Sequence, residues 1–355
     1  MTESNHLSAR FPAISDRLPR IELCALPTPI DRYSLTCFGR PATVWVKHDD
    51  ASGAVYAGNK VRKLEYLLGR VMARRYERVG TFGTVGSNHA LATALYARHL
   101  GLEPLCFLSH QTRTPLAAKT LRAHLSNGSE LVPFGGDYAE RLRTLREHLW
   151  RRRTAIVPMG GSSWLGTLGF VNAGLELAHQ MHSGLTPTFD RVYMATGTMG
   201  SAAGLAIGLA LADATTELHA VRVSHERIAS PDGFSQLVAK TCSMLTRVAD
   251  SFPNDTPDRV RVAWHHDYFA PGYARGNEKT ERALHVAAAD IGLTLEHTYT
   301  GKAFAAVLDH LADRHTPGNV LFWNTYHSAE PPHPSVAAAG QLRSLPDEFG
   351  RYLSV

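Results

Sequence analysis

Short hydrophobic runs alternate with longer amphipathic stretches along most of the chain. In the first half, runs rich in Val, Leu, Ile and Phe occupy residues 43–47, 79–83, 105–108, 131–134 and 154–158. Stretches with helical periodicity lie between them, at residues 87–99, 116–126 and 138–151. Strands that alternate with helices through short glycine-containing joins predict a parallel sheet covered by helices.

The second half of the chain repeats this alternation. The pattern predicts strands at 191–196, 219–223 and 319–323, and helices at 202–211, 233–248 and 276–291. Residues 1–20 are polar and contain Pro12 and Pro19, so we expect a loosely held arm there.

A lysine stands at the start of one amphipathic helix. The apolar face of that helix is predicted from the spacing of Leu64, Leu67, Leu68, Val71 and Met72. Gly58 and Asn59 provide turn and cap chemistry, which puts Lys60 in the first turn. The positive end of the helix dipole disfavours an ammonium there, and a neutral amine is a nucleophile. The alternative is a surface lysine with a solvated side chain.

A glycine-containing loop joins a predicted strand to a predicted helix at residues 196–201. Its hydroxyls and backbone N–H groups at a helix N-terminus are suited to bind a phosphate. The spacing matches neither the dinucleotide fingerprint nor the Walker A motif. The alternative is an ordinary tight turn. A nucleophilic lysine together with a phosphate loop is what pyridoxal 5'-phosphate requires.

Composition and charge narrow the function classes. The chain has 355 residues, 44% of them hydrophobic and 19% charged, which suits one large domain or two of moderate size. The formal charge of +5 is scattered along the chain. Its densest basic run, Arg151-Arg152-Arg153, is interpreted as cations at a helix C-terminus rather than a nucleic-acid site.

Cysteine and histidine usage indicates neither disulfides nor a metal site. Four cysteines show no paired spacing, which fits a reducing compartment, and no HExxH motif occurs among the 19 histidines. No apolar run approaches the ~18 residues of a membrane-spanning helix, and the N-terminus has no apolar signal core. We therefore expect a cytoplasmic protein without nucleic-acid or membrane partners.

The segment Gly58-Asn59-Lys60-Val61-Arg62-Lys63-Leu64-Glu65 resembles the signature of the D-cysteine desulfhydrase and 1-aminocyclopropane-1-carboxylate deaminase family of pyridoxal-phosphate enzymes. The resemblance extends from about Leu26 to about Thr325. It implies an α/β fold with two open, twisted, mostly parallel sheets covered by helices, the tryptophan-synthase-β-like fold or fold type II. It also implies a large cofactor-binding domain (1–60 and 175–355), a smaller substrate-side domain (61–174) and a homodimer.

The resemblance also implies roles for individual residues. Lys60 would carry the pyridoxal 5'-phosphate and act in catalysis with Ser87, Tyr273 and Tyr299. The small amino-acid substrate would be bound by Ser87, Asn88, His89, Gly161 and Ser162. Further cofactor contacts would come from Asn88, Gly197, Thr198, Met199, Gly200, Ser201, Thr300 and Thr325.

The chain departs from the family pattern at four places. Gly86 stands where glutamine is usual and Trp164 where proline is common. Met199 replaces a glycine of the phosphate loop, and Tyr326-His327 replaces the end of a His-Thr-Gly-Gly stretch. These changes alter the substrate side more than the cofactor side.

The residue near the cofactor's ring nitrogen bears on the reaction. The deaminase branch is expected to place a carboxylate after the second tyrosine, where this chain has Thr300, with Thr325 as a second candidate. A neutral hydroxyl stabilises a protonated ring less than a carboxylate does. This favours β-elimination of the D-cysteine desulfhydrase type, which gives a 2-oxo acid and ammonia. The alternatives are β-replacement, cyclopropane ring opening, a catalytically silent ligand-binding relative, and a sugar-phosphate enzyme that uses the loop at Gly197.

Overall fold

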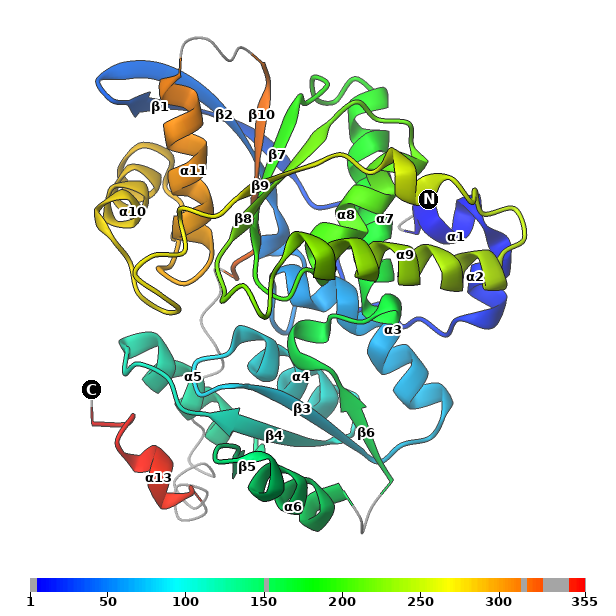
Figure 1. Cartoon of the computed structure of the whole chain (residues 1–355), viewed down its shortest axis with the longest axis vertical. Coiled ribbons are helices and arrows are strands. Elements are labelled where there is room, and N and C mark those ends of the chain that lie inside the picture. Colours follow the sequence, from blue (N-terminus) through cyan, green and yellow to red (C-terminus); the bar gives the residue numbers. More distant parts are fainter. Residues whose placement is uncertain (1–4, 150–152, 314–317, 328–344, 355) are drawn as a thin grey trace. The chain divides into compact units, whose positions relative to one another are not determined.

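The computed structural model describes residues 5–149, 153–313, 318–327 and 345–354, which form two compact units (Figure 1). The larger unit contains Met1–Tyr66 and Ser162–Ser328, and the smaller contains Leu67–Gly161 and Ala329–Val355. Arg151 and Arg152 of the basic run lie outside the described residues. No helix in the described part of the chain is long and apolar enough to cross a membrane.

The larger unit is built on a six-stranded sheet with the order β1-β2-β10-β7-β8-β9. Only the pair formed by the two N-terminal strands is antiparallel, and the other neighbours in this sheet are parallel. The strands are β1 (Ile30–Cys37), β2 (Arg40–His48), β7 (Arg191–Thr196), β8 (Glu217–Arg222), β9 (Val262–His265) and β10 (Val320–Asn324).

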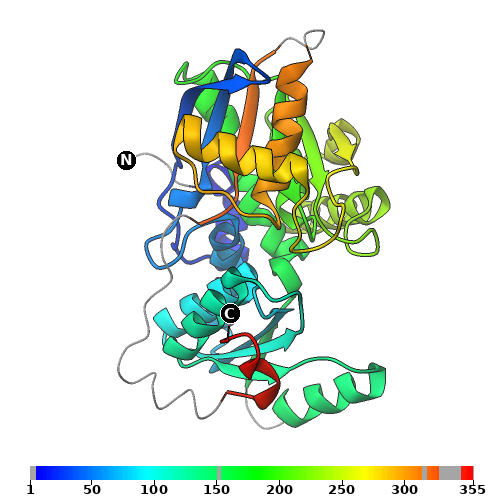
Figure 2. The ribbon, with the colours of Figure 1, turned by 90° about the vertical axis from the view of Figure 1, so that its left-hand side faces the viewer.

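Helices cover both faces of this sheet. Two of them, α10 and α11, lie on one face, and α7 and α8 lie on the other (Figures 1 and 2). The helices of this unit are α1 (His6–Arg10), α2 (Pro12–Arg17), α7 (Trp164–His182), α8 (Gly200–Leu211), α9 (Pro231–Val248), α10 (Glu278–Ile291) and α11 (Thr300–Ala312). Short 3-10 turns add η1 (Asp49–Ala51) and η3 (Thr256–Arg259).

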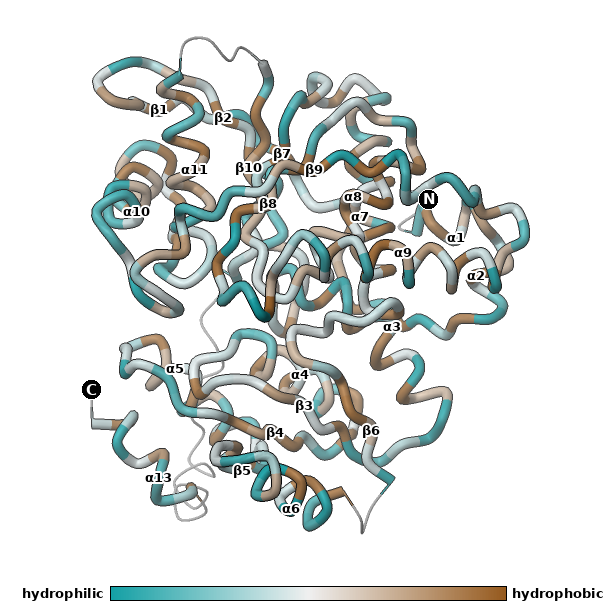
Figure 3. Tube along the Cα trace, viewed as in Figure 1, coloured by the Kyte–Doolittle hydropathy of each residue, from teal (hydrophilic) through white to brown (hydrophobic). Residues whose placement is uncertain are grey.

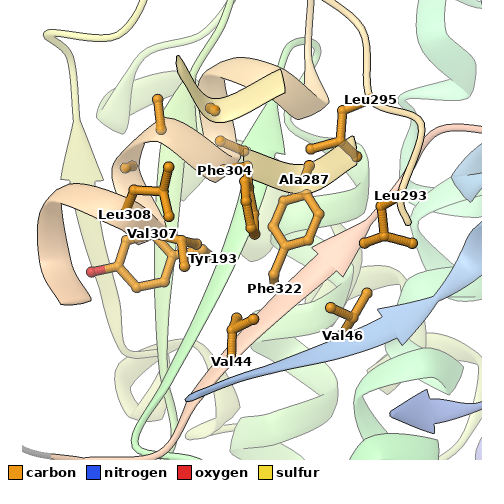
Figure 4. Packing of buried hydrophobic residues seen from close by; sticks show 14 of the residues in the cluster. Val44, Val46, Tyr193, Ala287, Leu293, Leu295, Phe304, Val307, Leu308 and Phe322 are labelled. Atoms are coloured by element: carbon orange, nitrogen blue, oxygen red, sulfur yellow. The ribbon is translucent and has the colours of Figure 1, made fainter. Parts of the chain in front are cut away.

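The core between this sheet and α10 and α11 follows from strand alternation. Val44 and Val46 of β2 point to the same side, where they join Phe322 of β10 and Phe304 of α11 (Figure 4). The rings of Phe304 and Phe322 pack edge to face with centroids 5.0 Å apart. Burial of these side chains holds the helices against the sheet.

The N-terminal segment is packed against the larger unit, so the predicted loosely held arm is wrong for its described part. Leu7 and Ile14 are fully buried and Phe11 is nearly so. The backbone N–H of Leu7 donates to Asn172 Oδ1 at 3.0 Å. Leu7 lies in α1, Ile14 in α2, and Phe11 joins the two helices, so each part of the segment contributes a buried side chain.

The smaller unit has a four-stranded parallel sheet with the order β5-β4-β3-β6. Its strands are β3 (Arg78–Thr84), β4 (Glu103–Ser109), β5 (Glu130–Pro133) and β6 (Thr154–Val157), and its helices are α4 (Asn88–His99), α5 (Pro115–Ser126), α6 (Tyr138–Leu149), α13 (Asp347–Gly350) and the 3-10 turn η2 (Met159–Gly161). Hydrophobic residues concentrate on β4, whereas α6 is largely hydrophilic (Figure 3).

The lysine-bearing helix, α3 (Asn59–Ala73), begins in the larger unit and continues in the smaller one. Its predicted apolar face is buried at Leu64 and Leu68, but Met72 is 39% exposed, so the predicted stripe is one residue too long.

Two long helices, α7 and α11, were not predicted from the hydrophobic pattern. Most residues of α7 are buried, and the first nine of α11 are buried on all sides. For α7 the reason is that a helix with almost no polar face shows little helical period in its sequence.

Candidate active site

The start of α3 is fixed by a buried ionic cluster. Arg62 donates to Asp49 Oδ1 from Nε at 3.0 Å and to Glu176 Oε2 from Nη1 at 2.9 Å. All three side chains are at most 1% exposed. A Cβ at Gly169 of α7 would come within 1.9 Å of the Arg62 carbonyl oxygen, so only glycine allows this approach of α7 to α3. The arginine of the signature therefore positions the helix.

Lys60 lies in the first turn of α3, as predicted. Its side chain is half-buried, and Nζ donates to Asn59 Oδ1 at 3.0 Å. Burial lowers the pKa of Lys60 to about 8. Asn59 in turn donates from Nδ2 to Ser201 Oγ at 3.0 Å. One asparagine therefore connects the lysine to the loop that was predicted to bind phosphate.

That loop runs from the end of β7 to the start of α8, as predicted, and its polar groups meet at Ser162. The hydroxyls of Ser162 and Thr198 share a hydrogen bond of 2.7 Å, and the N–H of Gly200 donates to Ser162 Oγ at 3.2 Å. Met199 adopts the left-handed conformation with φ 65°, which glycine adopts more readily. This conformation explains why a glycine is usual at that position.

Lys63 is a further member of this cluster, and sequence reasoning missed it. Its side chain is 1% exposed, and Nζ donates to Ser162 Oγ at 3.2 Å. Burial, and then the charge of Lys60, lowers the pKa of Lys63 well below its ordinary value. The signals in the sequence are its place within the signature segment and its spacing of one helical turn from Lys60.

These residues fit the phosphate group of pyridoxal phosphate. A Cβ at Gly200 would lie 2.6 Å from Ser162 Oγ and 2.9 Å from Lys63 Nζ, so a side chain there would fill the space between the polar groups. The backbone N–H groups at the start of α8 add the positive end of a helix dipole. A phosphate dianion at this place would offset the unfavourable burial of the lysine charge.

The two predicted tyrosines lie together. The hydroxyls of Tyr273 and Tyr299 are 2.5 Å apart, and their rings pack edge to face with centroids separated by 5.9 Å. A Cβ at Gly197 would be 3.5 Å from Tyr299 Cε1, so this ring lies beside the phosphate loop. Burial, and then the neighbouring Tyr273, raises the pKa of Tyr299 well above its ordinary value. The Tyr299 hydroxyl therefore keeps its proton at physiological pH.

The two predicted threonines, Thr300 and Thr325, lie in the larger unit, one at the start of a helix and one just after a strand. The carbonyl of Thr325, just after β10, accepts from the N–H of Asn59 at 3.2 Å. Thr300 is fully buried at the start of α11, and its hydroxyl donates to Glu296 Oε1 at 3.2 Å. The carboxylate of Glu296 also accepts from the N–H groups of Thr298, Tyr299 and Thr300. Sequence reasoning missed this carboxylate behind Thr300.

The other predicted residues belong to the smaller unit. Ser87 caps α4, where its Oγ accepts from the N–H of Ala90 at 3.2 Å, and Asn88 is the first residue of the helix. His89 is 4% exposed, and its Nε2 lies 2.9 Å from the Thr81 hydroxyl on β3. Gly161 ends the short turn η2. The cap and helix N-terminus at Ser87 and Asn88 form a second place where an anion is favoured.

One departure from the family pattern is accommodated by packing. His327 lies against Tyr56, with ring centroids 3.9 Å apart, and both side chains are buried. The two rings therefore pack together in the interior of the larger unit, next to Thr325 in the sequence.

Comparison with known proteins is consistent with this chemistry. Residues 21–325 match the family described as pyridoxal-phosphate dependent enzyme. The chain is 30% identical over 324 residues to D-cysteine desulfhydrase of Klebsiella pneumoniae and 31% identical over 327 residues to D-cysteine desulfhydrase of Salmonella paratyphi A. Each alignment covers 87% of this chain and 94% of the relative.

Solved structures show the same fold. An ACC deaminase homologue superposes with a TM-score of 0.73 at 26% identity, covering 94% of this chain and 98% of that one. An L-serine ammonia-lyase from Rhizomucor miehei superposes with a TM-score of 0.57 at 18% identity over 91% and 99% of the chains. The predicted fold type II and the predicted cofactor are confirmed. The chain belongs to the family of pyridoxal-phosphate dependent enzymes.

Proposed function

We propose that this protein is a pyridoxal-phosphate dependent lyase that eliminates the β-substituent of a small amino acid, D-cysteine or a related compound, and releases a 2-oxo acid and ammonia. One observation carries the proposal. Lys60, a lysine of lowered pKa, is connected through Asn59 to Ser201 in the loop at residues 196–201, which would bind the phosphate. The D-cysteine desulfhydrase relatives support this reaction type.

The residues of the larger unit would hold the cofactor. Lys60 would bind its aldehyde carbon, and Lys63, Ser162, Thr198 and the N–H of Gly200 would bind its phosphate. Thr300 or Thr325 would face the ring nitrogen, and Asn88 the 3'-oxygen. When bound, pyridoxal phosphate withdraws electrons from the Cα atom of the attached amino acid, which acidifies the Cα–H bond and favours loss of a β-substituent.

Proton transfer falls to Lys60 and the tyrosines. Lys60, with a pKa of about 8, would be the base that removes the Cα proton near neutral pH. Tyr299, whose pKa is raised, holds a proton that it can donate to the departing sulfur. The Tyr273 hydroxyl, 2.5 Å from that of Tyr299, would pass its own proton to Tyr299 after the donation. Ser87 is a second candidate for this proton transfer.

The substrate carboxylate would lie at the N-terminus of α4. Ser87 and Asn88 offer a hydroxyl, an amide and helix N–H groups there, and Gly161 and Ser162 would add further contacts to the substrate. His89 contributes by fixing the helix start against Thr81.

The proposed substrate preference rests on a neutral residue, Thr300 or Thr325, near the ring nitrogen. A neutral hydroxyl there favours fast elimination over cyclopropane ring opening. The Glu296 carboxylate accepts hydrogen bonds from three backbone N–H groups at the start of α11. Its oxygens are therefore used to stabilise the start of this helix. We also propose that the protein is a cytoplasmic homodimer, which light scattering of the purified protein and cell fractionation test.

The test is a screen of D- and L-amino acids and 1-aminocyclopropane-1-carboxylate for 2-oxo acid release, with Lys60→Ala as the control. We expect D-cysteine or a β-substituted relative to react and the cyclopropane substrate to react poorly. Added thiols reveal β-replacement if a new amino acid forms in place of pyruvate. Binding of amino acids without turnover would instead identify a catalytically silent relative and contradict the proposal.

A further inference from the structure

The C-terminal segment 345–354 packs within the smaller unit, although it lies beyond the residues that match the family. Phe349 and Tyr352 are fully buried in it. They join a cluster that includes Leu108 of β4 and Leu121 and Leu125 of α5. The segment is therefore anchored by the same apolar core that supports α4 and α5.

Tyr352 makes a specific polar contact from this core. Its hydroxyl accepts from the backbone N–H of Gln111 at 2.9 Å and donates to the carbonyl of the same residue at 3.0 Å. The ring of His110 stacks on Tyr352, with an interplanar angle of 15°. The backbone N–H and C=O of Gln111 are thus both hydrogen-bonded to a side chain 241 positions away in the sequence.

Gln111 passes this restraint to the loop before α4. Its Oε1 accepts from the N–H of Gly86 at 3.1 Å. A Cβ at Gly86 would lie 2.9 Å from Gln111 Nε2, so the glutamine amide lies against the side of the loop where Gly86 has no side chain. Glycine has more backbone freedom than other residues, and a hydrogen bond to its N–H limits that freedom. The next residues in the chain are Ser87 and Asn88.

We propose that Gln111, held in place by Tyr352, is a positioning residue for the segment Ser87–His89, so that the C-terminal segment sets the affinity for the α-carboxylate of the amino-acid substrate. This inference rests on the proposed function, which assigns the substrate carboxylate to that segment. Its physical basis is the ordering of the Val85–Gly86 peptide before the substrate arrives. A preordered loop avoids the entropy cost of ordering on binding.

The test uses Tyr352→Phe, Gln111→Ala and the double variant. Phenylalanine keeps the buried ring and loses only the hydroxyl. We expect each single variant to raise KM about five-fold, the effect of one lost hydrogen bond, and to leave kcat within about two-fold of the wild type. Cofactor content stays unchanged. Tyr138→Phe is the matched control, because Tyr138 is 79% exposed on α6 of the same unit.

Two comparisons can overturn the inference. If Tyr352 acts through Gln111, the double variant has the KM of Gln111→Ala alone, whereas additive effects or an unchanged KM in Gln111→Ala contradict it. Hydrogen exchange of residues 84–90 gives a readout without substrate, and we expect faster exchange in both single variants. If the wild type turns over no amino acid, the proposed function fails. The hydrogen-exchange measurement still tests the positioning role in that case. An unchanged exchange rate of residues 84–90 in the variants would overturn the role.

Discussion

Lys63 follows Lys60 by one turn of α3, and the two amines have different partners. Lys60 Nζ donates to Asn59 Oδ1 at 3.0 Å, and Lys63 Nζ donates to Ser162 Oγ at 3.2 Å. The Lys60 amine therefore contacts Asn59, the residue that begins the helix. The Lys63 amine contacts Ser162, where the polar groups that would bind the phosphate meet. This division suggests that one lysine binds the cofactor covalently and that the other neutralises its phosphate.

Replacement of Lys63 by Met should weaken cofactor binding without abolishing attachment at Lys60. Loss of a charged hydrogen bond to phosphate raises the Kd of the apoprotein for pyridoxal phosphate about 10- to 100-fold. Equilibrium dialysis measures this Kd, and borohydride reduction followed by peptide mapping shows whether Lys60 still carries the cofactor. Lys240→Met, an exposed lysine on α9, should bind like the wild type. An unchanged Kd in Lys63→Met would place the phosphate elsewhere.

Covalent attachment of the cofactor should depend on pH through Lys60. The neutral amine is the nucleophile, and burial brings the pKa of Lys60 from 10.5 to about 8. The rate at which the apoprotein develops a visible band with pyridoxal phosphate therefore rises as the pH increases to about 8 and levels off above it. Nα-acetyl-lysine under the same conditions corrects for titration of the cofactor itself. A rate that still rises steeply between pH 9 and 10.5 would contradict the lowered pKa.

Replacement of Arg62 by Met should destabilise the larger unit. It leaves the carboxylates of Asp49 and Glu176 buried without their shared cation, which costs about 3–5 kcal/mol in the free energy of unfolding. Urea unfolding at pH 7 measures this loss. The control is Arg247→Met, an exposed arginine on α9, which should change the free energy by less than about 0.5 kcal/mol.

The same variant has a pH signature. Burial alone would raise the pKa of Glu176, but Arg62 and Lys47 hold it below its ordinary value of 4.5. A carboxylate with a lowered folded pKa stabilises the protein above its unfolded pKa and loses that contribution as the pH falls. The difference in stability between wild type and Arg62→Met should therefore be full at pH 7 and narrow below pH 4.5. A difference that does not change with pH would show that the loss comes from packing alone.

Removal of the Tyr299 hydroxyl should affect turnover rather than cofactor binding. Tyr299→Phe keeps the ring beside Gly197 and loses the proton donor, so kcat should fall by ~10²-fold while cofactor content stays constant. Tyr273→Phe should cause a smaller loss, because Tyr299 remains. Stopped-flow assays with D-cysteine measure kcat, and Tyr138→Phe provides the control. Equal losses of cofactor and activity in Tyr299→Phe would indicate a structural role instead.

Local features of the chain were predictable because they depend on neighbouring residues. Hydrophobic periodicity located β7 at its observed bounds and placed Lys60 in the first turn of α3. The mostly buried helix α7 escaped the same reasoning, because a helix that is apolar on nearly all sides has little period to detect, whereas α11 was missed although its sequence is amphipathic. Residues 5–17 were misjudged because three apolar side chains, Leu7, Phe11 and Ile14, were enough to anchor them.

The sequence alone determined much of the alternation of strands and helices, the place of Lys60 in the first turn of α3 and the glycine loop before α8, since each follows from residues a few positions apart. Only the tertiary structure decided that Lys63 meets Ser162 across 99 positions, and that Tyr352 reaches Gln111 across 241. Such contacts depend on how whole elements pack, which no short-range pattern encodes. Burial in that packing also decides the proton affinities: it lowers the pKa of Lys60 to about 8 and raises the pKa of Tyr299 well above its ordinary value.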